Sequence, residues 1–149
     1  MIDLGPFLPA SRCVDLRSGE KEAALSELCA VAAGDSAVKD AAALRRAVLE
    51  REEVLSTGIG LGIAVPHAKI AGVKEFVLAL GRSRDGIDFG ALDGEPVRLA
   101  VLIAGPPDRQ ARYLQILAGV ALRLKRAEVR NALLAAKDGR EMVRILGRA

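Results

Sequence analysis

The chain has 149 residues, 51% of them hydrophobic and 28% charged, which suits one domain with a substantial core. The net charge of +3 is modest, aromatic residues make up only 3%, and no helix-turn-helix, zinc-finger or RNA-recognition pattern is present, so nucleic-acid binding is not indicated. The longest wholly apolar runs, such as 99–104, are far too short to cross a bilayer, and the N-terminus lacks the features of a signal peptide, so we expect a cytoplasmic protein with no direct membrane insertion.

The first third of the chain is predicted to be mainly helical. A short strand at 13–16 precedes a helix at about 20–33, whose apolar face carries Cys29. Cys13 and Cys29 suit a reducing compartment, and Cys29 is a candidate core residue rather than half of a disulfide. One histidine and two distant cysteines provide no ligand cluster with recognisable spacing, so we expect neither a metal site nor a cofactor.

The segment 40–55 is predicted to be an amphipathic helix with one inward-facing charge. Its apolar stripe is formed by Leu44, Ala47, Val48 and Leu55, with Val54 at its edge. Arg51 falls within that stripe, whereas the other charged residues, including Glu52, are expected on the exposed face or its flanks. A guanidinium directed at a core is costly without an anion, so either a buried carboxylate or a transient phosphate should lie in front of Arg51.

The segment 56–69 contains the only histidine of the chain, His67. Ser56 and Thr57 add hydroxyl donors, and glycines at 58, 60 and 62 lack Cβ atoms, which lets backbone N–H groups converge on a charged ligand. Pro66 should end a strand near 63–65 and place His67 at its tip. Imidazole, with a reference pKa of about 6.5, can accept a group near neutral pH and pass it on. An ordinary turn with a loop histidine would contain the same residue types, and the spacing differs from the G-x-G-x-x-G of dinucleotide-binding folds.

The remainder of the chain combines apolar strands with helices. The predicted strands are 75–81 and 97–103, with the short segment 87–89 between them, and the predicted helices run from the N-cap Asp108 to about 124, from 126 to 136 and from 139 to 146. This pattern indicates an α/β fold, one layered domain over residues 1–149, with a sheet covered by helices on both faces.

Two side-chain clusters lie on these later helices. Tyr113 shares a helical stripe with Leu117, Val120 and Leu124, which predicts a packing role. A basic cluster near the junction of two helices is expected to form a solvated face, or alternatively to dock an acidic partner. It consists of Arg123, Lys125, Arg126 and Arg130.

Three segments together, 51–52, 56–60 and 62–67, resemble the active-site signature of enzyme IIA of the bacterial sugar phosphotransferase system, in its fructose, mannitol and nitrogen-regulatory class. The segments 86–89, 92–97 and 107–118 follow in the order that the family shows, so the resemblance covers nearly the full length. The family's fold, a mixed β-sheet between helices, agrees with the α/β prediction.

The resemblance implies a phosphohistidine carrier. His67 matches the phosphoacceptor, which takes a phosphoryl group from an HPr-like protein, and Arg51 matches the active-site arginine. Thr57 and Gly58 match positions that line the pocket, and with Ser56 and Gly60 they are the expected phosphate-binding residues. Phosphoryl transfer requires mainly positioning and charge stabilisation, which an arginine, hydroxyls and backbone N–H groups supply.

One residue departs from the family pattern. Many relatives carry a second histidine where this chain has Tyr113, which can donate a hydrogen bond but cannot carry a positive charge or shuttle a proton near pH 7. We expect packing with a hydroxyl directed at the pocket, so phosphorylation of His67 should survive. A regulatory protein-binding module with weak or no onward transfer is a further alternative that this replacement leaves open.

Two roles follow from the resemblance. A nitrogen-type regulatory component is our main prediction, because no enzyme IIB or membrane segment is fused to these 149 residues and because the glycine segment resembles that branch. Its partners would be an HPr-like carrier and regulatory proteins. The alternative is a fructose- or mannitol-type component that passes the phosphoryl group to a cysteine of an enzyme IIB for sugar uptake.

Overall fold

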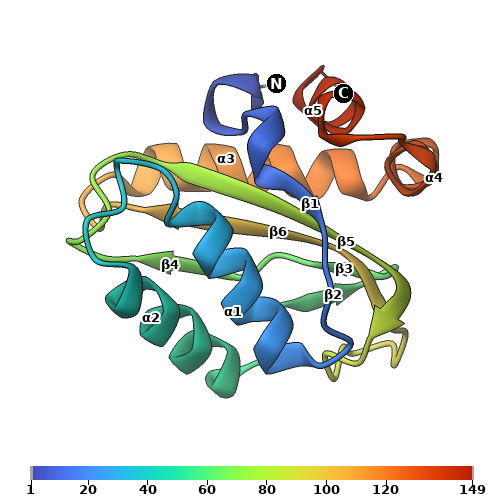
Figure 1. Cartoon of the computed structure of the whole chain (residues 1–149), viewed down its shortest axis with the longest axis horizontal. Helices are drawn as coiled ribbons and strands as arrows, with labels where there is room; N and C mark the ends of the chain where they lie inside the picture. The colour runs from blue at the N-terminus through green and yellow to red at the C-terminus, as the bar shows by residue number, and fades with distance from the viewer. Residues whose placement is uncertain (1, 149) are drawn as a thin grey trace.

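A six-stranded mixed sheet forms the centre of the molecule in the computed structural model, which describes residues 2–148 (Figure 1). The two longest strands, β5 (Val77–Ile87) and β6 (Val97–Gly105), are antiparallel, and β1 (Cys13–Asp15) lies parallel to β5 at one edge. Beyond β6, β3 (Ile63–Ala64) and β4 (His67–Lys69) both run parallel to it, and β2 (Gly58–Gly60) pairs antiparallel with β3. The α/β prediction with a mixed sheet is confirmed.

Helices cover both faces of this sheet, as predicted (Figure 1). On one face lie α1 (Lys21–Ala32) and α2 (Ala41–Val54), whose N-cap Asp40 accepts a hydrogen bond from the backbone N–H of Ala43 (3.0 Å). On the other face lie α3 (Gln110–Leu124), α4 (Ala127–Ala135) and α5 (Gly139–Arg148), together with the short 3-10 helices η1 (Gly5–Phe7) and η2 (Ala10–Arg12). Helix α3 begins one residue later than predicted, with Arg109 rather than Asp108 at its N-cap.

The two faces of the sheet carry side chains of different size. The face toward α3 to α5 is built from large residues of β5 and β6, namely Leu78, Leu80, Leu99, Val101 and Ile103. The face toward α1 and α2 carries three alanines, Ala79, Ala100 and Ala104, beside larger residues such as Val77 and Leu102. Because β5 and β6 are buried on both faces, their sequences are apolar runs rather than alternating patterns, as central strands of layered α/β folds are.

A buried arginine joins the sheet to α4. Arg82 on β5, only 1% exposed, donates to the Asp15 carboxylate (2.7 Å) and to the carbonyls of Leu133 and Ala136 (both 2.8 Å). These carbonyls lie at the C-terminal end of α4, where backbone acceptors lack partners within the helix. The hydrogen bond from Arg82 also lowers the pKa of Asp15.

The basic cluster does not form one solvated face, so that prediction was wrong. Arg123 is buried, 3% exposed, and donates to the carbonyl of Ile2. Arg130 donates to the carbonyls of Leu124 (3.0 Å) and Lys125 (2.7 Å) at the end of α3. Arg123 therefore binds the N-terminal segment, and Arg130 binds free carbonyls at the C-terminal end of α3. Of this group, Lys125 borders the cavity described below.

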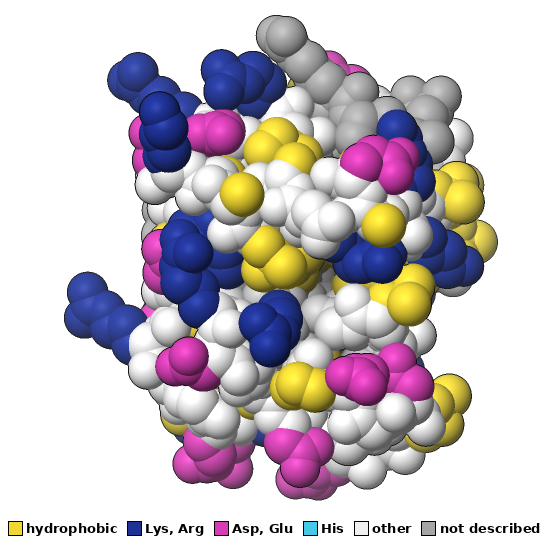
Figure 2. Space-filling model, turned by 90° about the vertical axis from the view of Figure 1, so that its right-hand side faces the viewer, with side chains coloured by type: hydrophobic (Ala, Val, Ile, Leu, Met, Phe, Trp, Pro, Cys, Tyr) yellow, Lys and Arg dark blue, Asp and Glu magenta, His cyan; other side chains and the backbone are white. Residues whose placement is uncertain are grey.

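The surface on the α4 side of the molecule carries both signs of charge (Figure 2). Lysine and arginine side chains lie over the upper and middle parts of this face, acidic side chains lie among them and along its lower edge, and hydrophobic groups lie between the charges. A nucleic-acid-binding face would instead show a continuous basic stripe. Within residues 2–148, no helix is both long and apolar enough to span a bilayer.

Candidate functional site

His67 lies at a break in the edge of the sheet. Strands β3 and β4 pair with β6 one after the other, and Pro66 separates them. Pro66 has no N–H to donate, but its carbonyl accepts a hydrogen bond from the N–H of Ile103 (3.0 Å), which keeps the chain close to β6. The sequence predicted His67 at the tip of the preceding strand, but His67 is the first residue of β4.

One ring nitrogen of His67 is already engaged. Nδ1 lies 3.0 Å from the carbonyl oxygen of Val65, and because a carbonyl only accepts, Nδ1 carries the proton. The lone pair of the neutral ring is then on Nε2. Burial is the main cause that lowers the pKa of His67 below 6.5, and the positive charges of Arg51 and Lys69 act in the same direction. The lowered pKa favours the neutral ring at pH 7, with the Nε2 lone pair free.

Arg51 and Glu52, at the C-terminal end of α2, differ from the prediction. The buried row of this helix is Leu44, Val48 and Glu52, spaced four residues apart, whereas Leu55 is 63% exposed. Glu52 is therefore buried instead of facing solvent. Arg51 is half-buried and donates to the carbonyl of Leu55 (2.8 Å), which leaves most of its guanidinium donors for other partners.

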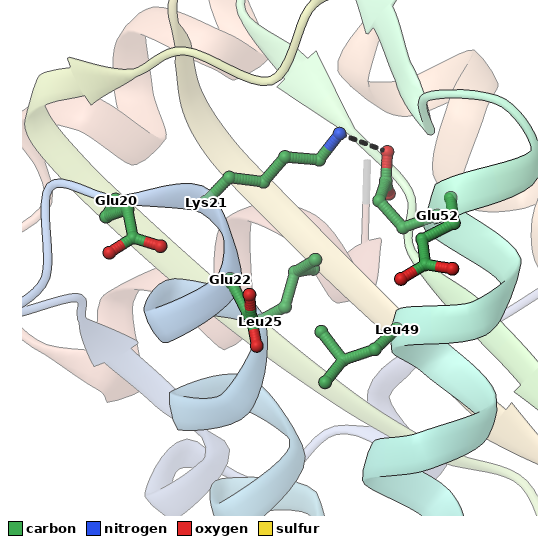
Figure 3. Close-up of a pocket in the computed structure, with 7 residues that line it drawn as sticks. Glu20, Lys21, Glu22, Leu25, Leu49 and Glu52 are labelled. Atoms are coloured by element: carbon green, nitrogen blue, oxygen red, sulfur yellow. Dashed lines mark ion pairs between the residues drawn. The ribbon is translucent and has the colours of Figure 1, made fainter.

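The carboxylate of Glu52 accepts hydrogen bonds from the loop that follows α2. It accepts from the backbone N–H of Thr57 (2.8 Å) and from the Thr57 hydroxyl, and it pairs with Lys21 Nζ (2.9 Å) across the cleft between α1 and α2 (Figure 3). Lys21 Nζ also donates to the carbonyl of Phe89 (2.9 Å), which accepts from the Ser56 hydroxyl as well (2.8 Å). The loop is therefore held by α1, α2 and the segment that follows β5.

The glycines of this loop build a hairpin rather than an open cradle of amides. Leu61 and Gly62, with φ of 60° and 75°, form a two-residue turn between β2 and β3, where φ is positive at both positions. The N–H of Leu61 donates to Asp93 (3.0 Å), and that of Gly58 donates to the Ser56 hydroxyl (3.0 Å). The N–H groups of Thr57, Gly58 and Leu61 therefore already have acceptors within the protein. The expectation that the amides of this loop converge on a ligand was wrong for these three.

An open cavity of about 610 Å³ joins these elements. Arg51, Ser56, Thr57, Gly58 and His67 line it. The rest of its wall is mainly apolar, and Lys125 adds one further cation. The apolar part consists of Leu55, Ile59, Val65, Gly90, Leu92, Leu117 and Ala121. Five of the seven predicted site residues thus meet at one cavity.

The other two predicted site residues, Gly60 and Tyr113, lie outside this lining. Gly60 has a φ of 92°, and a Cβ there would meet the Asp93 carboxylate at 3.1 Å, so its role is in the hairpin. Tyr113 on α3 is buried, with its ring centroid 5.8 Å from that of His67 and tilted by 49°. Lys69 Nζ lies 4.4 Å from the centre of the same ring. Tyr113 is therefore a neighbour of the imidazole with a packing role.

Sequence reasoning missed Glu52, Lys21 and Lys125 as parts of the site. The spacing of Leu44, Val48 and Glu52 was the available signal for the first. Lys21 belongs to a helix 30 residues upstream, so no local pattern indicates it. Within residues 2–148, no group of three or more histidine, cysteine, aspartate or glutamate side chains is arranged to hold a metal ion.

Comparison with known proteins gives a consistent result. The family model described as "Phosphoenolpyruvate-dependent sugar phosphotransferase system, EIIA 2" matches residues 11–149. The nitrogen regulatory protein of Pseudomonas aeruginosa is 31% identical over 147 residues, which cover 98% of this chain and 96% of that protein. The fructose-specific EIIABC component of Bacillus subtilis is 38% identical over 133 residues, which cover 89% of this chain but only 21% of that longer protein.

A solved structure shows the same architecture. The crystal structure of the nitrogen regulatory protein IIA-Ntr from Neisseria meningitidis superposes with a TM-score of 0.89 at 30% identity. The superposition covers 96% of this chain and 98% of that one. The similarity therefore extends over the whole layered domain and includes both helical layers.

Proposed function

Because the chain belongs to the EIIA 2 family of the phosphoenolpyruvate-dependent sugar phosphotransferase system, a family of phosphoryl carriers, we propose that His67 is its phosphoacceptor and Arg51 its main phosphate-binding residue. The observation that carries this proposal is the Nδ1 hydrogen bond to Val65, which leaves Nε2 as the nucleophile on a ring that lines the same cavity as Arg51. No cofactor is required, since the donor supplies the phosphoryl group.

The transfer step exchanges one N–P bond for another. The Nε2 lone pair of His67 forms a bond to the phosphorus of a phosphohistidine on an HPr-like carrier, and the carrier's own N–P bond breaks. The electron pair stays on the carrier's nitrogen, and the carrier's ring takes up one proton from solvent. The phosphorylated His67 ring is cationic while Nδ1 keeps its proton, and release of that proton to solvent balances the one taken up by the carrier. Arg51 offsets the charge on the equatorial oxygens, and Lys125 adds positive charge at the cavity wall.

The surface around the cavity suits a protein donor. Three exposed, large apolar side chains line it, namely Leu55, Ile59 and Leu92. An exposed apolar patch with a reactive group at its centre is typical of a docking face. The proposed donor is therefore an HPr-like protein, and we place the exchange in the cytoplasm, where the free, buried thiols of Cys13 and Cys29 would stay reduced.

The experiment is phosphorylation from phosphoenolpyruvate through enzyme I and an HPr-like carrier, followed by intact mass and an acid-lability test. We expect one acid-labile phosphoryl group on the wild type and none on His67→Ala. Arg51→Gln should slow the reaction by about two orders of magnitude, the usual effect of removing one transition-state donor. An acid-stable phosphate that persists in His67→Ala would overturn the assignment.

Among the family's roles, we propose the nitrogen-type regulatory one. It is supported by the match over almost the entire lengths of the Pseudomonas aeruginosa and Neisseria meningitidis proteins. A role in fructose uptake is the second candidate, favoured by the higher identity to the Bacillus subtilis component. The test is transfer from the phosphorylated protein to the cysteine of a fructose-type IIB domain. Transfer at a rate comparable to that of His67 phosphorylation would support sugar uptake, whereas no transfer would support regulation.

A further inference from the structure

We propose that Lys69 is a second phosphoryl-binding residue, whose ammonium group would meet a phosphoryl group on Nε2 of His67 from the side of β4 and α3. This inference rests on the phosphoacceptor role of His67 and adds a residue that lies outside the cavity lining. Three independent features of the structure carry it.

The first feature is strand geometry. His67 and Lys69 are the first and third residues of β4, so their side chains leave the strand on the same side, about 6.6 Å apart along it. Both residues are half-buried. A four-carbon side chain covers that distance easily, so the ammonium group reaches the surroundings of the imidazole without any change in the backbone.

The second feature is the position of the ammonium group in the unphosphorylated protein. Lys69 Nζ lies 4.4 Å from the centre of the Tyr113 ring and donates to the Gln110 side chain, and the Tyr113 ring lies 5.8 Å from that of His67. An aromatic face attracts a cation but does not neutralise it. Lys69 has no carboxylate partner among the ion pairs of the described residues, so its positive charge stays available for an incoming anion.

The third feature is the surrounding electrostatics. Lys69 contacts Gln110, the first residue of α3, and the first turn of that helix contains no acidic residue. A cation at the positive end of a helix is normally unfavourable. A phosphoryl group on His67, with about two negative charges by analogy with other phosphorylated side chains, would make both the cation and the helix end favourable. The arrangement therefore fits an anion at Nε2 better than the unphosphorylated ring.

The charged and titratable groups that act on the imidazole can be named for each packed element. Arg51 and Glu52 come from α2, Lys69 from β4 itself and Tyr113 from α3. Arg51 and Lys69 both lower the pKa of His67, whereas Glu52 raises it. Removal of the Lys69 charge should consequently raise the pKa of His67, an effect that a purely structural role would not produce.

The test uses Lys69→Met and Lys69→Arg, with Lys137→Met as a control that removes the same charge from an exposed site between α4 and α5. We expect the rate of phosphoryl acceptance to fall about tenfold or more in Lys69→Met and to stay near normal in Lys69→Arg and Lys137→Met. The pKa of His67 should rise in Lys69→Met alone. Thermal unfolding identifies any loss of structure. Tyr113→Phe keeps the ring face, so it should keep Lys69 in place and retain most of the rate.

Two failures are distinguishable. If Lys69→Met accepts phosphoryl groups at the wild-type rate while His67→Ala accepts none, Lys69 has no such role and the phosphoacceptor assignment stands. If the wild type itself is not phosphorylated at His67, the proposed function is wrong. An unchanged His67 pKa in Lys69→Met would, by itself, contradict the electrostatic basis of the Lys69 inference.

Discussion

The environment of His67 determines when the ring is competent to react. Because burial and two nearby cations hold its pKa below 6.5, the neutral form persists to lower pH than in a free imidazole. We expect the rate of phosphoryl acceptance to stay level from pH 8 to about 6.5 and to fall only at lower pH. The ring has a single resonance set, since it is the only histidine, so NMR titration measures its pKa directly.

The same shift links folding to pH. A histidine whose pKa is lower in the folded state binds its proton more readily when unfolded, so stability falls as pH drops from the ordinary value of about 6.5 toward the lowered value. In His67→Gln this part of the pH dependence should disappear, as urea unfolding at several pH values would show. An identical pH profile for both proteins would mean that the pKa of His67 is not lowered.

Leu61 is the one non-glycine residue with positive φ among the described residues, and it occupies a conformation that costs an ordinary side chain about 1 kcal/mol. Leu61→Asn creates the Asn-Gly pair that such hairpin turns favour. We expect the free energy of unfolding to rise by about 0.5–1 kcal/mol, as measured by urea denaturation. Leu92→Asn, another exposed leucine, is the control and should change stability little.

At the scale of elements, Lys21 joins α1 to the loop that carries the site. It neutralises a buried carboxylate, and its loss in Lys21→Met would leave Glu52 unpaired beside Thr57. We expect a loss of about 3 kcal/mol in unfolding free energy, because breaking such a pair leaves a buried carboxylate without its counter-charge. Phosphoryl acceptance should also slow, because the loop that contains Ser56 loses the contacts of Lys21 with Glu52 and with the Phe89 carbonyl.

Two variants separate this support from general packing. Lys21→Arg keeps the charge and should restore most of the stability and rate. Lys39→Met removes an exposed lysine directly before Asp40, the N-cap of α2, and should have little effect on stability or rate. Equal behaviour of Lys21→Met and Lys39→Met would contradict the role given to the pair with Glu52.

The elements also show where sequence reasoning reaches its limit. The segment 40–55 was predicted almost to its ends, because helical periodicity and the Asp40 cap are local signals. Strands β2 and β4 were missed, since three residues are too few to show a period. Glu52 was placed on the wrong side although it continues the spacing of Leu44 and Val48, because its counter-charge, Lys21, becomes a neighbour only in the folded chain.

At the scale of the whole molecule, the layered arrangement followed from apolar patterns in the sequence, and the meeting of Arg51 with His67 at one cavity followed from the family resemblance. The hydrogen-bond partners inside that cavity did not. The sequence suggested amides and hydroxyls directed at an anion, yet most of these groups bind Glu52, Asp93 and the Phe89 carbonyl. Competition among acceptors is a property of the assembled fold, which no short motif encodes.

The two cysteines lie in separate cores, Cys13 on the α3 side of the sheet and Cys29 on the α1 side. Burial raises the pKa of each thiol to about 12, so the reactive thiolate is scarce at neutral pH. We expect Ellman's reagent to label both thiols only after unfolding, at a rate that follows global opening. Fast labelling of either in native buffer would reveal local opening of that layer.

The contact between Tyr113 and His67 has a practical consequence. The chain has no tryptophan, and Tyr113 is its only tyrosine, so all of its near-ultraviolet emission beyond phenylalanine comes from a phenol 5.8 Å from the imidazole. Any charge that arrives on the imidazole alters the electric field at that fluorophore. The unlabelled protein thus contains its own optical reporter, and stopped-flow fluorescence can time each arrival and departure of the group that it carries.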